Sequence, residues 1–542
     1  MPVTWEEHEK ELHNPALCEQ LPLRDYLDNV IVRTDGAFVA GYDLRGRTAY
    51  FASDDERNRA KVMLGALLKS IPEQSMRVQI RYEVVEDIGN LLEGYAAQCC
   101  SEHSVSSVLD SMRLEAWRVN AAAGHYLRPL LHVYLVWNPL THHSVSGKST
   151  KRSLPSWSFS ANKCIERSRR EHEELLAEFE SLLVGIETTL QAAELGPRRL
   201  TDRELFLETK RALNPLESDT RDYIPGEGLL EYRSARQQLA NVSILEETDS
   251  YLNIGGLLYS IVSLKELPDA TFPGILRELV GLDFPIFVNA QFTIPDQTKV
   301  LKGYKSRLRK MQAAQHDAHG GFRVNVEAQV AEAQLFKVQQ EIIASSIKTA
   351  KLSLVICART SKRAATCTEF EEAERVISNR RQQLLYAVAR MNGAKAITET
   401  LAKRRLFFSS LPGMGEADKR EQDMLTTNAV DLLPVETPWQ GTPRSPLFLF
   451  ETPYRQLIPF SPFDPSLSDA NMLIMAKSGG GKTFMVLQLL SMASRANPLV
   501  SIIERGDSYR SLVELMGGRM VTMSLDAEQT INPWDLPDGE SQ

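Results

Sequence analysis

The sequence predicts an α/β protein, in which an α+β N-terminal region precedes the start of a parallel sheet built around a Gly-rich loop. Three observations predict it. Strand-like and helix-like apolar patterns alternate along the chain. The pair Asp35-Gly36 separates two β-branched runs, which is typical of a hairpin. Near the other end, the apolar run Asn471–Met475 is followed by a glycine loop, a helical pattern and a second β-branched run.

The first region carries clear strand and helix patterns. Alternating or β-branched runs predict strands over 29–34, 37–42, 48–52, 77–85 and 131–137. Helical periodicity predicts helices over 54–70 and 168–195, and a Ser-, His- and Lys-rich stretch predicts a loop over 141–160. The core side of the first helix is expected to hold Ala60, Val62, Met63, Ala66 and Leu67.

A second region begins near Asn214-Pro215. Its predicted strands span 241–246, 255–264, 284–293 and 352–358. Its predicted helices span 272–279, 297–318, 326–349 and 369–392. The pair Gly320-Gly321 separates two of these helices, and this break predicts a helical hairpin or arm.

The third region contains the strongest chemical signal, a glycine loop between a strand and a helix. Backbone N–H groups in such a loop can surround a nucleotide triphosphate, because glycine leaves room for the anion. The candidate nucleotide-binding residues are Ser478, Gly479, Gly480, Gly481, Lys482, Thr483 and Phe484. Lys482 is expected to reach the β- and γ-phosphates, and the Thr483 hydroxyl to bind Mg²⁺, which makes these two the catalytic candidates. ATP and Mg²⁺ are therefore the expected cofactors.

The flanking residues support this interpretation. A helical apolar pattern runs from Phe484 to Ala496, and Leu499–Glu504 is a β-branched run that should pair beside 471–475. Ala476 stands where the stricter loop motif has glycine, but its small side chain should allow the turn. The alternative is a chance Gly-rich turn between a strand and a helix.

Length and composition limit the class of protein. A chain of 542 residues is too long for one core and predicts about three domains. The net charge of −8 argues against a protein that coats nucleic acid over its whole surface. The six scattered cysteines fit reduced thiols. Without a signal pattern or a membrane-length apolar run, the sequence predicts a cytoplasmic chain.

Several motifs occur in an order that resembles a known family. The resemblance includes Leu411-Pro412-Gly413, the stretch Thr426–Pro434, the glycine loop, Glu504–Tyr509, the pair Gly517-Gly518 and Ile531–Trp534. In this order they resemble the conjugative type IV secretion ATPases, the VirB/TraC-like assembly ATPases. Glu504 replaces an aspartate of the family pattern. The resemblance covers nearly the whole chain, although only the glycine loop is specific by itself.

The resemblance implies an ATP-driven motor that powers pilus or channel assembly and substrate transfer, in the cytoplasm at the inner face of the cell membrane. It implies hexamers, inner-membrane and channel partners, and DNA contact through the apparatus. Glu504 and Tyr509 become weaker candidates near the nucleotide. The expected domains are 1–214, 215–433 with a helical arm, and 434–542 as an incomplete RecA-like ATPase domain.

Hydrolysis requires more than a phosphate loop. A second carboxylate at the end of a later apolar strand normally helps to hold Mg²⁺ and positions water. No such strand follows Glu504, so the sequence predicts a C-terminally shortened member that binds nucleotide weakly and turns it over poorly alone. Two alternatives stay open: a DNA-pumping translocase, and a non-enzymatic scaffold with a vestigial nucleotide site.

Overall fold

The computed structural model describes residues 17–48, 52–99, 104–145, 161–216, 234–242, 244–314, 336, 347–442, 444–467 and 469–523. The chain forms two compact units. We call residues 1–86 and 127–439 the sheet unit, and residues 87–126 and 440–542 the loop unit. Among the described helices, none is long and apolar enough to cross a membrane.

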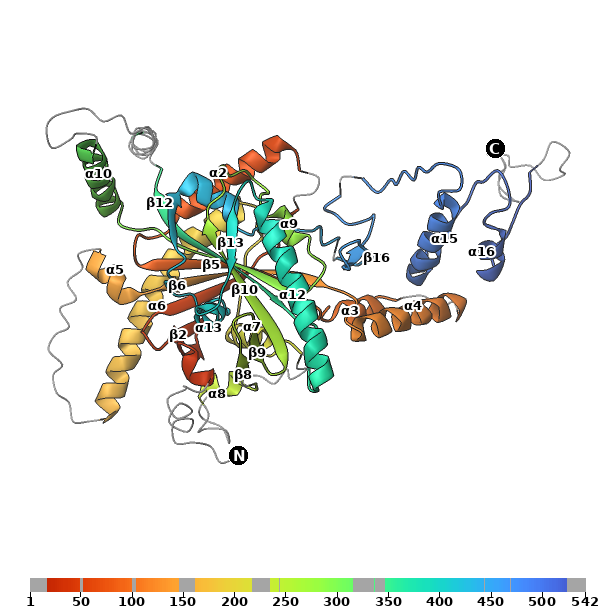
Figure 1. Cartoon of the computed structure of the whole chain (residues 1–542). Helices are drawn as coiled ribbons and strands as arrows, with labels where there is room; N and C mark the ends of the chain where they lie inside the picture. Colours follow the sequence, from red (N-terminus) through yellow and green to blue (C-terminus); the bar gives the residue numbers. More distant parts are fainter. Residues whose placement is uncertain are drawn as a thin grey trace, which may run out of the picture. The chain divides into compact units, whose positions relative to one another are not determined.

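A 13-stranded antiparallel sheet is the centre of the sheet unit (Figure 1). Its main path runs β1-β2-β3-β6-β5-β11-β12-β10-β9-β8, with β7, β13 and β14 attached to β3, β10 and β12. The strands are β1 Leu23–Leu27, β2 Val30–Arg33, β3 Phe38–Asp43, β5 Met76–Val85, β6 Arg128–Trp137, β7 Arg198–Arg199, β8 Ile244–Glu247, β9 Leu252–Ile254, β10 Leu257–Glu266, β11 Ile286–Thr293, β12 Thr349–Arg359, β13 Lys395–Thr398 and β14 Gln422–Leu425. The short strands β4 (Arg47–Thr48) and β15 (Glu436–Thr437) form a separate parallel pair.

The hairpin predicted from Asp35-Gly36 is confirmed. Strands β2 and β3 pair antiparallel, with Ile31 opposite Val39. Gly36 has a φ of +81°, which glycine adopts without steric cost, and the Asp35 carboxylate accepts a hydrogen bond from the Ala37 N–H at 3.1 Å. The local sequence therefore determines this turn.

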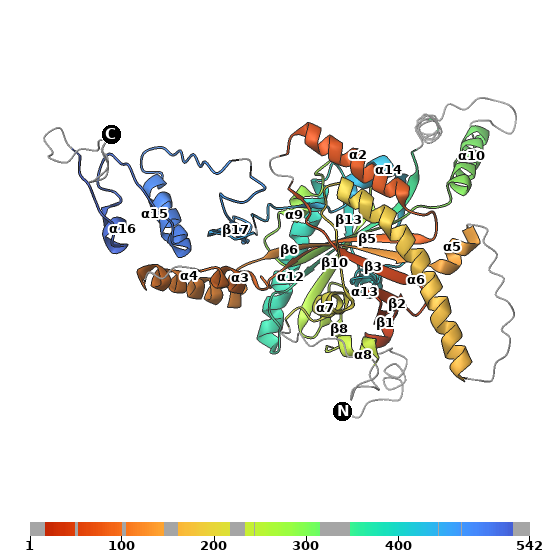
Figure 2. The same cartoon turned by 180° about the vertical axis from the view of Figure 1, so that it is seen from behind.

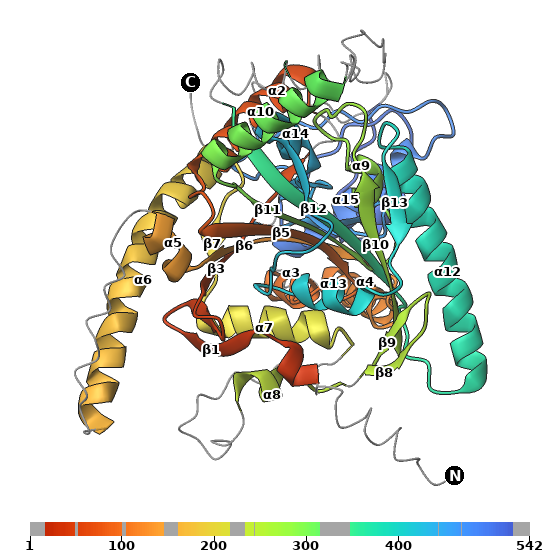
Figure 3. The ribbon, with the colours of Figure 1, turned by 60° about the vertical axis from the view of Figure 1, so that its left-hand side comes forward.

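Helices cover both faces of the sheet (Figure 3). One face packs against α2, α6, α9, α12 and α14, and the other against α7, α8 and α13. The helices of the sheet unit are α2 Asp54–Ser70, α5 Pro139–Val145, α6 Ala161–Ala192, α7 Asp202–Leu213, α8 Ala235–Leu239, α9 Arg277–Val280, α10 Gln297–Ala314, α12 Cys367–Ala389, α13 Lys403–Ser409 and α14 Thr426–Ala429. The two apolar clusters separated by the sheet form the core.

Helix α2 has the predicted bounds but buries a different face. Ser53 and Glu56 form a capping box that fixes its start. The side chains of Val62 and Met63 are exposed, so their predicted inward orientation is wrong. The predicted burial of Leu67 is confirmed, and Leu64 and Leu68 are buried with it, because a stripe at this helical spacing faces the sheet.

Two other predictions need correction or lie outside the description. Residues 141–145 of the predicted loop belong to α5, while 146–160 lie outside the described residues. The predicted helix over 326–349 also lies mostly outside them, and its last residue, Thr349, begins β12 instead. Pairing of Thr349 with Leu425 of β14 explains why an extended conformation prevails there.

Strand β5 is buried on both faces but differs between them. Val78, Ile80, Tyr82 and Val84 belong to the apolar core on one side. The alternate residues Gln79, Arg81 and Glu83 are also buried. Because successive strand residues point to opposite faces, these three form a polar strip on the second face.

The polar strip holds the main chain of residues 409–413. The Gln79 amide donates to the carbonyl oxygens of Ser410 at 3.2 Å and Leu411 at 3.0 Å, and accepts from the Gly413 N–H at 3.1 Å. Arg81 also donates to the Ser410 carbonyl oxygen at 2.5 Å, and Gln291 of β11 donates to that of Ser409 at 2.9 Å. The Leu-Pro-Gly element is thus hydrogen-bonded to the sheet through its backbone. Substitutions in the polar strip would break these hydrogen bonds.

The loop unit combines two sequence segments. Residues 87–126 supply α3 (Leu91–Ala97) and α4 (Ser104–Ala122). Residues 440–523 supply the antiparallel pair β16 (Phe448–Glu451) and β17 (Leu457–Phe460), α15 (Lys482–Ala493), the 3₁₀ turn η3 (Ser494–Ala496) and α16 (Arg510–Leu515), shown in Figure 2.

The predicted parallel strands beside the glycine loop are not formed. Residues 471–475 and 499–504 carry no strand assignment. Ile474 packs against the small cluster of β16 and α15, but Leu473 is 81% and Leu499 100% exposed. A parallel pair is stable when further strands flank it and helices cover both faces. Among the described residues of the loop unit, no third strand lies beside these segments, so the prediction is wrong for this structure.

Replacement of Gln79 by leucine should destabilise the sheet unit. It leaves the Gly413 N–H and the Asn289 Oδ1 buried without a partner, at a cost of about 3 kcal/mol in total. Urea unfolding followed by circular dichroism should show a lower midpoint. Gln191→Leu, on the exposed side of α6, is the control and should leave the midpoint unchanged. Equal midpoints for both variants would contradict the structural role of Gln79.

Candidate nucleotide-binding site

The glycine loop forms a tight turn that ends in a helix. Gly479 and Gly481 have φ values of +76° and +78°, a backbone conformation that other residues rarely adopt. The Gly480 N–H donates to the Lys477 carbonyl oxygen at 3.0 Å and closes the turn. A Cβ atom on Gly480 would lie 3.0 Å from that same oxygen. The three glycines therefore serve the turn itself, and Ala476 is compatible with it.

Helix α15 begins directly after the turn. Gly481 is its N-cap, and no side chain accepts a hydrogen bond from its first N–H groups. The first turn of a helix leaves such donors unsatisfied, and the helix dipole adds a partial positive charge there. This end of the helix can therefore accept an anion.

The predicted site residues lie together at this end. Ser478, Gly479, Gly480, Gly481 and Lys482 are exposed, and Thr483 is half-buried. Phe484 lies in the first turn of α15, and its side chain is 73% exposed. The opposite face of the helix is anchored, because Leu489 and Met492 pack against Phe448 of β16.

Glu504 and Tyr509 are not joined to the turn. Tyr509 is the N-cap residue of α16, and Glu504 is exposed. In the described part of the chain, no hydrogen bond or ion pair connects either residue to 478–484. Within the same ranges, no group of three or more His, Cys, Asp or Glu side chains could hold a metal ion. The turn can thus bind phosphate, but no described carboxylate completes a hydrolytic centre beside it.

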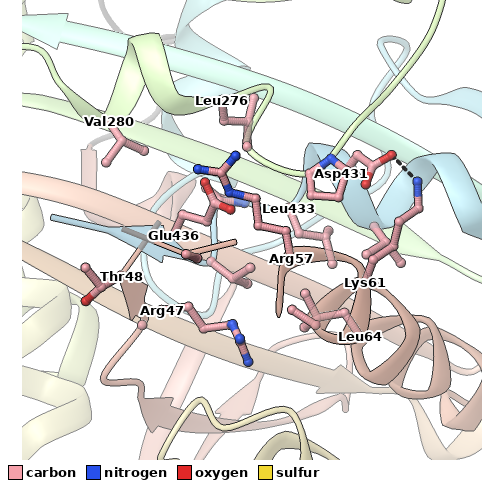
Figure 4. A pocket seen from close by; sticks show the side chains of 18 of the residues that line it. Arg47, Thr48, Arg57, Lys61, Leu64, Leu276, Val280, Asp431, Leu433 and Glu436 are labelled. Carbon is pink, nitrogen blue, oxygen red and sulfur yellow. Dashed lines mark hydrogen bonds and ion pairs between the residues drawn. The ribbon is translucent and has the colours of Figure 1, made fainter. Parts of the chain in front are cut away.

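A separate cavity of about 240 Å³ lies within the sheet unit. It is lined by α2, by the β4–β15 pair, by residues 273–280 and by residues 430–435 (Figure 4). Lys61 forms an ion pair with Asp431 at 2.6 Å. The residues that line the cavity come from four separate stretches of the sequence, so no local sequence pattern could predict it. None of the turn residues lines this cavity.

The carboxyl group of Glu436 lines this cavity, where burial disfavours its charged form. Burial raises the pKa of Glu436 above its ordinary value of 4.5, while Arg57, Arg277 and Arg47 act against that rise. Figure 4 shows Arg57 and Glu436 on the same side of the cavity. The protonated carboxyl is therefore favoured in the folded protein more than in the unfolded chain.

Two comparisons with known proteins concern this chain. Residues 458–542 match the family model described as the TraG P-loop domain. The chain is also similar to the conjugal transfer protein TrbE of Rhizobium radiobacter, with 22% identity over 95% of this chain. That match covers 62% of the relative, so the chain spans less than two thirds of its length. The matched P-loop range contains the turn and α15.

The raised pKa of Glu436 predicts a specific pH dependence of stability. A folded-state pKa above the unfolded value gives stability that is present below pH 4.5 and lost as pH rises through the folded-state pKa. Glu436→Gln removes this loss, so the variant should melt at a higher temperature than the wild type at neutral pH and show no such gain at pH 4.5.

Thermal melting at a series of pH values measures this difference. Glu194→Gln is the matched control, because Glu194 lines the same cavity but its side chain is 77% exposed. A Glu436→Gln advantage that did not change with pH would contradict the assigned cause.

Proposed function

We propose that the chain is a member of the conjugative type IV secretion ATPases of the VirB/TraC-like group and that it binds ATP with Mg²⁺ through residues 478–484. The observation that carries the proposal is the turn itself. Two glycines with positive φ bring unpaired N–H groups to the start of α15, inside the range that matches a P-loop domain. This arrangement suits a chain of phosphates.

Each residue has a distinct role in this proposal. The N–H groups of Gly479, Gly481, Lys482 and Thr483 surround the β-phosphate, and the exposed Lys482 ammonium neutralises the β- and γ-phosphates. The Thr483 hydroxyl holds Mg²⁺. When bound, Mg²⁺ neutralises charge on the phosphates as the terminal phosphoryl group leaves.

We further propose that nucleotide turnover serves a transfer apparatus. The named relative is a conjugal transfer protein, which supports a motor role in channel or pilus assembly and in the transfer of substrate. Hexamers, inner-membrane and channel partners, and a position at the inner face of the membrane are parts of the same proposal. Because no described carboxylate lies at the turn, this chain alone should hydrolyse ATP slowly.

Replacement of Lys482 by alanine should abolish most nucleotide affinity. Loss of a charge-assisted contact to phosphate costs about 1.5–3 kcal/mol, which corresponds to roughly a tenfold to a hundredfold weaker binding constant. Titration with a fluorescent ATP analogue and Mg²⁺ measures it. Lys477→Ala, five residues earlier and also exposed, is the control and should bind like the wild type. Equal losses in both variants would point to nonspecific charge attraction and contradict the site.

Replacement of Thr483 should separate metal binding from phosphate binding. Thr483→Ala should bind the ATP analogue with nearly the same affinity whether or not Mg²⁺ is present, because the metal loses its protein ligand. Thr483→Ser retains the hydroxyl and should keep the wild-type dependence on Mg²⁺. Full Mg²⁺ dependence in Thr483→Ala would show that another group holds the metal.

A further inference from the structure

Helices α3 and α4 belong to the same compact unit as the candidate nucleotide site. In the sequence, both helices lie between β5 and β6, two neighbouring strands of the sheet unit. In the structure, they pack with residues 440–523. Figures 1 and 2 both show α4 running beside the end of α15. A segment far away in sequence therefore contacts the helix that begins at the glycine turn.

The central contact is a buried arginine, Arg495 in η3, two residues beyond α15. Its side chain is 2% exposed. The guanidinium carbon lies 3.3 Å from the centroid of the Tyr95 ring, and Nη2 donates to the Tyr95 carbonyl oxygen. The same nitrogen lies 3.6 Å from Oδ2 of Asp110, whose side chain is 4% exposed. Arg495 thus joins the end of the phosphate helix to both inserted helices.

This cluster is incompletely hydrogen-bonded. In the described structure, Nε and Nη1 of Arg495 and Oδ1 of Asp110 have no hydrogen-bond partner although all three atoms are buried. The 3.6 Å separation is an ion pair but is too long for a hydrogen bond. Buried polar groups left in this state cost free energy and call for an explanation. A small shift of η3 toward α4 would convert the pair into a two-bond contact between guanidinium and carboxylate.

One further contact restrains the same helix end, and another joins α3 to the segment before β16. Arg113 of α4 donates to the carbonyl oxygen of Ser491 at 3.4 Å and also to its hydroxyl. The Tyr95 hydroxyl donates to the Leu447 carbonyl oxygen at 3.1 Å, next to β16. Burial lowers the pKa of Arg113, as expected for a cation enclosed between two helices. The end of α15 is therefore tied to α4 by Arg113 at Ser491 and, through η3, by the Arg495–Asp110 pair.

We propose that Tyr95, Asp110 and Arg495 are positioning residues for the nucleotide site, and that they couple nucleotide binding to the α3–α4 segment. The proposal rests on the proposed nucleotide-binding function. Helix α15 has 12 residues and moves as a rod of about 18 Å, so an axial shift at its N-terminal end appears also at η3. By linkage, a change in the Asp110–Arg495 contact must alter nucleotide affinity as much as nucleotide alters that contact.

The alternative is that the cluster stabilises the loop unit and does nothing else. The two accounts differ in what a variant does to the folded protein. A purely structural cluster affects the melting temperature, whereas a coupled cluster also affects the affinity of the folded fraction for nucleotide.

The test uses the full chain, a fluorescent ATP analogue and Mg²⁺. Asp110→Asn and Arg495→Met should each weaken binding by about tenfold, within the 5- to 150-fold range of coupled sites. The double variant should bind more tightly than the product of the two single effects predicts, since it leaves no unpaired buried charge. Glu115→Gln and Arg118→Met, both exposed on α4, are the matched controls and should bind like the wild type.

Melting temperatures without nucleotide accompany the titrations. If Arg495→Met fails to fold, Arg495→Lys keeps the charge and should still weaken binding, because lysine lacks the planar group that stacks on Tyr95. Variants that melt earlier but bind with wild-type affinity would overturn the coupling and leave the nucleotide site intact. A wild-type chain without saturable binding would overturn the proposed function, and this proposal with it.

Discussion

An anion can approach a protein backbone closely only where no side chain intervenes, and the turn at 478–483 meets that condition. Its left-handed residues are glycines, and its N–H groups end at a helix that has no side-chain cap. All functional conclusions depend on this geometry. In the proposed site, Lys482 and Thr483 gain a role only because the turn would place phosphates beside them.

The rest of the loop unit holds the glycine turn in position through its contacts with α15. Helix α15 is held along one face by Phe448 and at its far end by Arg495 and Arg113. The partners of these arginines come from residues 87–126, which the chain inserts between two strands of the sheet unit. Because α15 is held at its C-terminal end, a small displacement at its N-terminal end would also change the contacts with the inserted helices. In our proposal these helices can therefore regulate nucleotide affinity.

Local patterns could predict much of this structure from the sequence. The Asp35-Gly36 hairpin, the capped helix α2 and the glycine turn each follow from a few adjacent residues. Features that need distant partners could not be predicted. Arg495 resembles an ordinary end-of-helix arginine until Tyr95 and Asp110 are beside it. Similarly, the apolar run 471–475 predicts a strand, but no described neighbouring strand accepts its hydrogen bonds.

Amide hydrogen exchange of the full chain, with and without saturating ATP and Mg²⁺, would show whether phosphate binds at the glycine turn. Exchange should be slower in peptides that cover 478–484, where bound phosphates would occupy the N–H groups. Peptides that cover 46–61 in the cavity of the sheet unit should exchange unchanged. Unaltered exchange at 478–484, together with protection of the cavity peptides, would contradict phosphate binding at the turn.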